Sequence, residues 1–296
     1  MIHYSCCPVC GGEDIQFKLA VKDHTVSQKE FPVWQCNACT ARFTQDVPGE
    51  NEIGGYYASE NYVSHSDTRT GIVNRLYHVI RRLTLRSKRR IVIKETGMAK
   101  GTVLDIGCGT GAFIHHMHNA GWDITGLEPD EAARKKADEL YALNPLEPSR
   151  LFELQPAYYN AITMWHVLEH VHNLHGYLQQ ASELLAPGGR LLIAVPNYTS
   201  YDAGFYKEHW AAWDVPRHLY HFSPACMNQM LKKFNLQLLI CKPMWYDSFY
   251  VSMLSEQYKH GKGNLIRASW VGLVSNLKAM WNIGKCSSVI YIIGRK

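Results

Sequence analysis

The stretch Thr102-Val-Leu-Asp-Ile-Gly-Cys-Gly-Thr-Gly111 decides the fold of this chain. It is an apolar strand that runs into a glycine-rich turn, and a helical pattern follows from Ala112 to Ala120. Gly107, Gly109 and Gly111 lack side chains, so the backbone there can approach a ligand closely in conformations that other residues resist. In an open α/β sheet such a turn lies at the carboxyl ends of the strands, where ligands bind.

Around this turn, residues 101–240 alternate short apolar runs with helical patterns. This alternation predicts an α/β fold, a doubly wound and largely parallel sheet with helices on its faces. The expected strands are Val103–Ile106, Ile124–Leu127, Ala161–Trp165, Arg190–Val195 and Leu236–Ile240, with a last strand over Ser287–Ile293. Only the region from Leu140 to Leu151 is poorly marked, because Pro145 and Pro148 interrupt it.

The glycines alone allow two ligands. Gly107-x-Gly109-x-x-Ala112 also satisfies the dinucleotide fingerprint, and Glu128 falls at the expected distance of about 20 residues. Asp105, however, places a carboxylate just before the turn, where it suits a cationic amino-acid group and would repel a pyrophosphate. Glu128 ends the second strand and can accept from both hydroxyls of a ribose. A nucleotide-binding dehydrogenase remains the alternative.

Four stretches together resemble the class I S-adenosylmethionine (SAM)-dependent methyltransferases: Val103–Gly111, Gly126-Leu-Glu-Pro129, Trp165-His-Val-Leu-Glu-His-Val171 and Ala186-Pro-Gly-Gly-Arg190. The resemblance implies a seven-stranded, Rossmann-like sheet and SAM, or its product S-adenosylhomocysteine, as the ligand. It also implies that adenine packs near Leu146 and Glu147. The cofactor-binding residues that it implies are Asp105, Gly107, Cys108, Gly109, Gly111, Glu128, Pro129, Glu147, Trp165 and His166.

Two Cys-x-x-Cys pairs stand near the start of the chain, Cys7-Pro-Val-Cys10 and Cys36-Asn-Ala-Cys39. Zinc prefers four thiolates in a tetrahedron, and each pair supplies two from one tight turn. A segment this short cannot fold on its apolar core alone, so the metal would supply the missing stability. Four protein ligands leave no open position, which predicts a structural zinc in a zinc-ribbon-like module.

The stretch His166-Val-Leu-Glu169-His170 lies at the end of the fourth strand, at the predicted pocket mouth. In the class I family it usually forms part of the SAM wall. It also resembles the Glu-x-x-Glu-His metal site of ubiquinone O-methyltransferases and small-RNA 3′-end methyltransferases, with His166 in place of the first Glu. Both interpretations, a pocket wall and a catalytic metal site, stay open; histidine here suits a transition metal better than magnesium.

A second candidate for catalysis is the segment Trp213-Asp-Val-Pro-Arg-His-Leu-Tyr-His-Phe-Ser223. Ser223 and the proline after it predict a helix start, so the residues before them form a loop toward the cleft. The segment resembles the active-site loop of zinc-bearing sugar C-methyltransferases, which implies that His218 is the general base. Arg217 replaces that family's Glu, and its fork of donors indicates an anionic group on the substrate. For His221 a structural role is the alternative.

The domain organisation predicted from these patterns has three parts. A zinc-ribbon-like module covers residues 1–48, a linker and basic helical segment covers 49–100, and the methyltransferase domain covers 101–296 with a helical lid at about 242–284. Nine cysteines, an odd and unevenly spaced set, argue against a disulfide framework and for a reducing, cytoplasmic location. The sequence shows no secretory signal, and its apolar runs are too short to span a bilayer.

The predicted function is methylation of a small-molecule acceptor, with a sugar, a nucleotide-sugar or a polysaccharide precursor as the favoured class. The alternative is an RNA methyltransferase, in which Arg81-Arg82…Arg86…Lys88-Arg89-Arg90 forms a phosphate-contacting stripe. A net charge of only +5 favours the small molecule. A binding protein with an inactive SAM fold is a third possibility, against which His218 and Arg217 argue.

Overall fold

The computed structural model describes residues 1–57 and 72–296, and within these the side chains of 1–57 and 82–296. Its main sheet has the strand order β5-β4-β6-β7-β10-β9. The strands are β4 (Thr102–Ile106), β5 (Asp123–Leu127), β6 (Tyr159–Trp165), β7 (Leu185–Pro196), β9 (Leu236–Pro243) and β10 (Ser288–Arg295). β5, β4, β6 and β7 pair in parallel, and β10 runs antiparallel to both β7 and β9. The strands and the fold class predicted from the apolar runs are confirmed.

The seventh strand is reduced to one residue. Beyond β5, among the described residues, only an isolated parallel bridge joins Leu127 to Leu146. It is held by the amide of Leu146 on the carbonyl of Gly126, at 2.8 Å, and by the amide of Glu128 on the carbonyl of Leu146, at 2.9 Å. Pro145 and Pro148 lie close to this bridge on either side and have no N–H to donate, so the ladder cannot extend.

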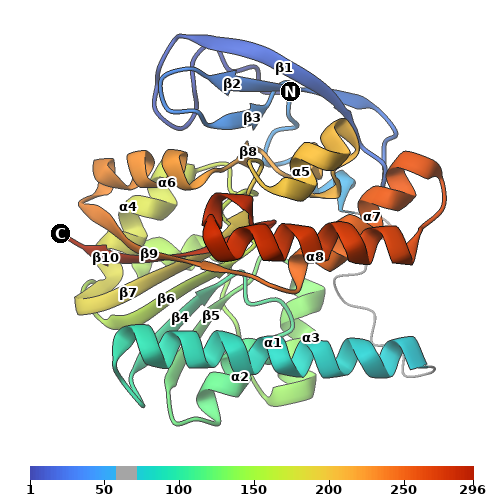
Figure 1. Ribbon diagram of the computed structural model, residues 1–296. Helices are drawn as coiled ribbons and strands as arrows, with labels where there is room; N and C mark the ends of the chain where they lie inside the picture. Colours follow the sequence, from blue (N-terminus) through green and yellow to red (C-terminus); the bar gives the residue numbers. More distant parts are fainter. Residues whose placement is uncertain (58–71) are drawn as a thin grey trace.

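Helices cover both faces of the sheet (Figure 1). One face carries α1 (Ile72–Thr96), α2 (Ala112–His118) and α3 (Glu131–Tyr141), and the other carries α4 (Leu174–Leu184) and α6 (Pro224–Leu231). The first face buries Val92 and Phe113 against the sheet, and the second buries Leu178 and Met227. Because β4 and β6 pair in parallel, their carboxyl ends lie side by side, with the glycine turn directly after β4 and His166 directly after β6.

The N-terminal module is a small antiparallel sheet that lies against the larger part of the molecule (Figure 1). Its strands are β1 (Ile15–Lys22), β2 (Glu30–Cys36) and β3 (Arg42–Thr44), and its fourth strand is β8 (Tyr220–His221). β8 comes from the loop that precedes α6, and it pairs with β3 at Phe43–Tyr220 and Arg42–His221. Strand pairing therefore joins the module and the larger part of the chain in one sheet. The predicted domain boundary at residue 48 stays a prediction.

Three further helices complete the fold. α5 (Tyr201–Tyr206) follows β7, and α7 (Asp247–His260) and α8 (Leu265–Trp281) form a hairpin between β9 and β10. The hairpin occupies the insertion predicted at about residues 242–284, and its role as a lid remains a prediction. In the part of the chain that the structure describes, no helix is both long enough and apolar enough to cross a bilayer.

Candidate functional site

The four predicted cysteines lie together. Their sulfur atoms are all within 4.8 Å of one another, with Cys7 Sγ 3.6 Å from Cys39 Sγ and Cys10 Sγ 3.5 Å from Cys36 Sγ. Each pair sits in a tight turn, closed in the first by the amide of Gly11 on the carbonyl of Cys7 at 2.8 Å. Three of the four residues are at most 1% exposed. Four sulfurs at this spacing fit the tetrahedral thiolate site that zinc prefers.

Asp105 is the penultimate residue of β4, beside the glycine turn, and is 1% exposed. Its carboxylate accepts a hydrogen bond from the hydroxyl of Thr163, at 2.5 Å, because β4 and β6 pair with these two residues opposite each other. Burial raises the pKa of Asp105 to about 7, and the Thr163 hydrogen bond and the Lys88 charge reduce the rise. Burial thus disfavours the ionised form of this carboxyl group, and a cationic group of a ligand would stabilise it.

The glycine turn needs its glycines for two different reasons. Gly107 has a φ of +75°, and a Cβ there would lie 2.4 Å from Cγ2 of Val167. Gly109 has a φ of +56° but faces open space, so its backbone is accessible to a ligand. Cys108 is buried between them, and Gly111, with a φ of +77°, begins α2. The contact between Gly107 and Val167 brings the predicted cofactor turn against the His166–His170 stretch.

Glu128 is held at the end of β5 by two backbone amides. Its Oε2 accepts from the amide of Gly109 at 2.7 Å, and its Oε1 accepts from the amide of Asp130 at 3.0 Å. Arg134 donates to the carbonyls of Glu128 and Pro129 and also pairs with Glu147 at 3.3 Å. These contacts bring Glu147 to the same end of β5 as Glu128, next to the Leu146 bridge. Their assignment to ribose and adenine stays a prediction.

Trp165 closes β6 and is 8% exposed. The ring of Phe113 packs edge-on against it at 5.6 Å, and the Lys88 ammonium lies 4.5 Å from the centre of its ring. Burial lowers the pKa of Lys88, while the charges of Asp105 and Asp247 oppose this change. Lys88 therefore faces the predicted cofactor pocket and does not extend the basic stripe considered for RNA.

His166 directly follows β6 with a φ of +58°. Its Nε2 lies 2.9 Å from Oδ2 of Asp247 at the start of α7, and its Nδ1 lies 3.3 Å from Oε1 of Glu169. Burial lowers the pKa of His166, but the two carboxylates raise it more, to about 10. At neutral pH His166 is thus an imidazolium that ties α7 to the sheet edge, and it has no lone pair with which to accept a proton.

Glu169, His170 and His218 converge in a cluster, here called the Glu-His-His cluster, whose ligand atoms lie within 4.8 Å of one another. Nδ1 of His170 is 3.0 Å from the carbonyl oxygen of Arg217, and Nδ1 of His218 is 2.9 Å from that of Ala212. A carbonyl oxygen can only accept, so in each neutral ring the proton sits on Nδ1 and Nε2 keeps its lone pair. Glu169 is fully buried, and its Oε2 has no hydrogen-bond partner within the described residues.

The charges in the Glu-His-His cluster suit a proton acceptor or a cation. Burial and the neighbouring His218 lower the pKa of His170 to about 4, so its ring is neutral at pH 7. Burial raises the pKa of Glu169, but the hydrogen bond with His166 and the positive charge of that imidazolium lower it more, so its carboxyl is ionised. One buried carboxylate and two imidazoles that orient on backbone carbonyls form the donor set of a transition-metal site.

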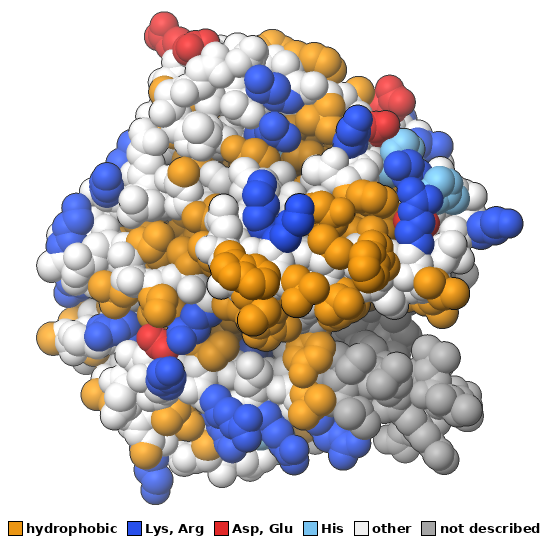
Figure 2. Space-filling view, viewed as in Figure 1, with side chains coloured by type: hydrophobic (Ala, Val, Ile, Leu, Met, Phe, Trp, Pro, Cys, Tyr) orange, Lys and Arg blue, Asp and Glu red, His pale blue; other side chains and the backbone are white. Residues whose placement is uncertain are grey.

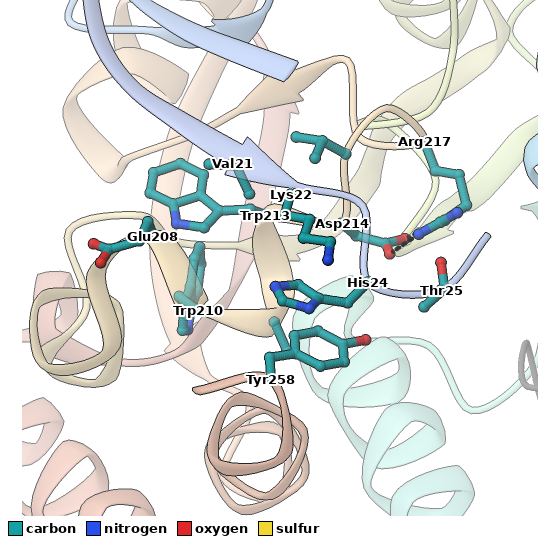
Figure 3. Close-up of a pocket in the computed structure, with 12 residues that line it drawn as sticks. Val21, Lys22, His24, Thr25, Glu208, Trp210, Trp213, Asp214, Arg217 and Tyr258 are labelled. Carbon is teal, nitrogen blue, oxygen red and sulfur yellow. Dashed lines mark hydrogen bonds and ion pairs between the residues drawn. The ribbon is translucent and has the colours of Figure 1, made fainter. Parts of the chain in front are cut away.

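Arg217 lies in the predicted loop before α6 and is held there by partners from the protein itself. It is 1% exposed, and its guanidinium donates to both carboxylate oxygens of Asp214, to the carbonyl of Tyr56 at 2.8 Å and to Asp23 at 3.3 Å. Figure 3 shows the Arg217–Asp214 pair beside a small pocket, between residues 21–25 of the module and Tyr258 of α7. These contacts join the loop to the module, and the role of Arg217 toward an anionic substrate stays a prediction.

The module also holds His218 directly. Thr44, the last residue of β3, donates from its hydroxyl to the carbonyl of His218 at 2.6 Å, and its amide donates to the carbonyl of Leu219 at 2.9 Å. The Thr44 hydroxyl is also 3.1 Å from Nε2 of His221, which is buried and packs on the ring of Trp213. His221 thus has structural contacts, and Thr44, which no sequence pattern marked, positions the loop that carries His218.

Comparisons with known proteins agree with this geometry. Residues 75–240, more than half of the chain, match the family described as methyltransferase domain, and the chain belongs to that family.

Two curated relatives illustrate the match. The ubiquinone biosynthesis O-methyltransferase of Maricaulis maris is 30% identical over 129 residues, which is 40% of this chain and 51% of that protein. The mitochondrial ubiquinone biosynthesis O-methyltransferase of Homo sapiens is 26% identical over 163 residues, 50% of this chain and 44% of that protein. The chain thus spans about half the length of these relatives.

Among solved structures, magnesium protoporphyrin IX methyltransferase from Synechocystis with bound S-adenosylhomocysteine has a TM-score of 0.50 and 14% identity. The match covers 78% of this chain and 90% of that one. At this identity the likeness concerns the fold alone.

Proposed function

We propose that this protein transfers the methyl group of SAM to a hydroxyl oxygen of a small-molecule acceptor that binds beside the Glu-His-His cluster. The observation that carries the proposal is the buried, unpartnered Oε2 of Glu169 next to two imidazoles whose Nδ1 contacts with carbonyl oxygens leave Nε2 as the acceptor atom. The relatives named above are O-methyltransferases, which supports oxygen as the acceptor atom. A sugar acceptor rests only on the resemblance of the loop at residues 213–223, so we propose the hydroxyl and leave its parent molecule to experiment.

On the cofactor side, Asp105 supplies the carboxylate for the cationic amino group of SAM, and Glu128 accepts from the ribose hydroxyls. Both residues lie at the carboxyl ends of the paired parallel strands β4 and β5, and Gly109 leaves open space above the turn. The zinc proposed at the four cysteines would have no open coordination position, so its part is to hold the module together.

On the acceptor side, the hydroxyl oxygen attacks the methyl carbon, and the bond from that carbon to the sulfonium sulfur breaks with its electron pair left on sulfur. The hydroxyl proton moves to Nε2 of His218, which its Nδ1 contact leaves as the acceptor. If a divalent cation binds, Glu169, His170 and His218 would hold it, Nε2 of His218 would then be a ligand and not the base, and the cation would instead lower the pKa of the acceptor hydroxyl.

The test is transfer of labelled methyl from SAM to a panel of phenols, catechols and sugars, with the products analysed for O-methyl groups. His218→Ala should lose at least about a hundredfold in turnover while SAM still binds. His118→Ala, which changes an exposed histidine on α2, is the matched control. Methyl transfer only to carbon or nitrogen, or full turnover by His218→Ala, would contradict the proposal.

A further inference from the structure

The helical hairpin of α7 and α8 exposes an unusual amount of apolar surface. Figure 2 shows hydrophobic side chains gathered over these helices, with Lys and Arg side chains around them. On α8, Ile266 is 85% exposed, Trp270 64% and Trp281 81%. The other large apolar residues exposed on residues 244–285 are Trp245, Tyr246, Phe249, Tyr250, Met253, Leu265, Leu273, Leu277 and Met280. Patches of this size on a soluble protein mark an interaction surface.

Helix α8 turns its small residues toward the protein and its large apolar residues outward, the reverse of an ordinary surface helix. Its side toward the protein buries small residues, Ala268, Gly272, Ser275 and Ala279 among them. At Gly272 the helices approach so closely that a Cβ would lie 3.1 Å from the backbone of Phe249 in α7. A surface helix normally turns its large apolar residues to the core. Here they point outward, away from the residues that the structure describes.

Buried polar contacts fix this arrangement to the body of the protein. Asp202 of α5 is fully buried and accepts from Ser275 of α8 at 2.8 Å, from Ser287 at 2.7 Å and from the indole of Trp210 at 2.7 Å. The outward position of the large side chains is therefore built into the fold, and α8 cannot roll over to bury them without breaking the buried hydrogen bond from Ser275 to Asp202.

The charges of the hairpin are one-sided. Within residues 244–285 the acidic residues are Asp247 and Glu256, and both are paired inward, with His166 and with Arg267 respectively. The exposed charged side chains of this described segment are all basic: Lys259, Lys262, Arg267, Lys278 and Lys285. A second copy would place cation against cation, whereas an anionic lipid surface complements the charge and takes up the apolar side chains.

From these observations we propose that the α7–α8 hairpin is a membrane-binding surface that lies flat in the headgroup region of an anionic bilayer. Its Trp and Tyr side chains suit the boundary between lipid and water, where one part of the ring is apolar and another is wet. The surface begins next to the candidate acceptor site, because Asp247 at the start of α7 contacts His166.

The experiment is flotation of the purified protein with vesicles of phosphatidylcholine alone and of phosphatidylcholine mixed with phosphatidylglycerol. The protein should float with the anionic vesicles and much less with the neutral ones, and added salt should release it. Trp270→Ser should weaken binding roughly tenfold or more, since a large apolar side chain no longer enters the lipid. Lys262→Gln should weaken it about fivefold.

The matched control is Phe17→Ser, which removes an exposed aromatic residue on β1, 54% exposed and far in sequence from the hairpin. It should float like the wild type. Failure of the wild type to float with anionic vesicles overturns the proposal, as does equal loss in Phe17→Ser and Trp270→Ser. Self-association that Trp270→Ser abolishes, without vesicle binding, would show that a second copy covers the face. The measurement needs no methyl transfer, so its outcome is independent of the proposed activity.

Discussion

The substitution Thr44→Val tests whether the N-terminal module positions the catalytic loop. Valine has the shape of threonine but no hydroxyl, so it removes the 2.6 Å hydrogen bond to the carbonyl of His218 and the contact with His221. The backbone bond from residue 44 to Leu219 remains, and so does the pairing of β3 with β8. The variant should therefore fold with the loop intact in outline but loosened at His218.

The magnitude follows from burial. Thr44 is fully buried and His218 is 8% exposed, so water cannot readily replace the lost hydroxyl donor. A buried acceptor left without its partner costs about 1–3 kcal/mol, and the free energy of unfolding should fall by that amount. A displacement of His218 by about 1 Å should lower turnover about a hundredfold, while the affinity for SAM, which rests on other residues, stays the same.

Urea unfolding and methyl-transfer kinetics measure the two effects. Thr44→Ser is the matched control, because it keeps the hydroxyl and should restore most of both stability and turnover. The reasoning fails if Thr44→Val unfolds at the wild-type urea concentration and turns over at the wild-type rate, or if Thr44→Ser is as impaired as Thr44→Val.

Three more predictions concern the other parts of the site. The affinity for SAM should rise as pH increases through about 7, the raised pKa of Asp105, because only the ionised carboxylate pairs with the amino group of SAM; calorimetry should show this rise in the wild type and a flat profile in Asp105→Asn. Cys36→Ser should lose bound zinc in native mass spectrometry and unfold at lower temperature, whereas Cys6→Ser, outside the cysteine cluster, should keep its metal; equal zinc in both would refute the four-cysteine site. Arg217→Lys keeps the charge but cannot bridge Asp214, Tyr56 and Asp23 together, so urea unfolding should show a loss of about 1–3 kcal/mol with SAM binding retained; an unchanged stability would contradict this structural role of Arg217.

Sequence patterns predicted the parts of this fold that depend on neighbouring residues. The apolar runs located the sheet strands, because a strand buried on both faces must be apolar along its length. The spacing of Cys7, Cys10, Cys36 and Cys39 predicted the cysteine cluster, because each pair is brought together by its own turn. The weak signal for the third strand also has a local cause, because Pro145 and Pro148 limit the pairing in this region to one bridge.

The contacts that a sequence cannot reveal are those between distant segments. Arg217 contacts Asp23 across 194 positions, and His218 contacts Thr44 across 174, and no local pattern marks either partner. The sequence predicted that Arg217 lies in a loop before α6, but the direction of its side chain depends on contacts with the module. Thr163, opposite Asp105, was the exception: aligning the strands of a parallel sheet would have found it.

The pairing of β8 with β3 makes the four cysteines and the Glu-His-His cluster parts of one thermodynamic system. A ligand that orders the loop around His218 also orders β8 and, through strand pairing, β3 of the module. A metal that orders the four cysteines acts on the same pair of strands from the module. Coupling of this kind is reciprocal. If zinc occupies the four cysteines, an acceptor that binds more tightly to the zinc-loaded protein must, by the same factor, raise the affinity for zinc, so the zinc affinity becomes a measure of occupancy at the acceptor site.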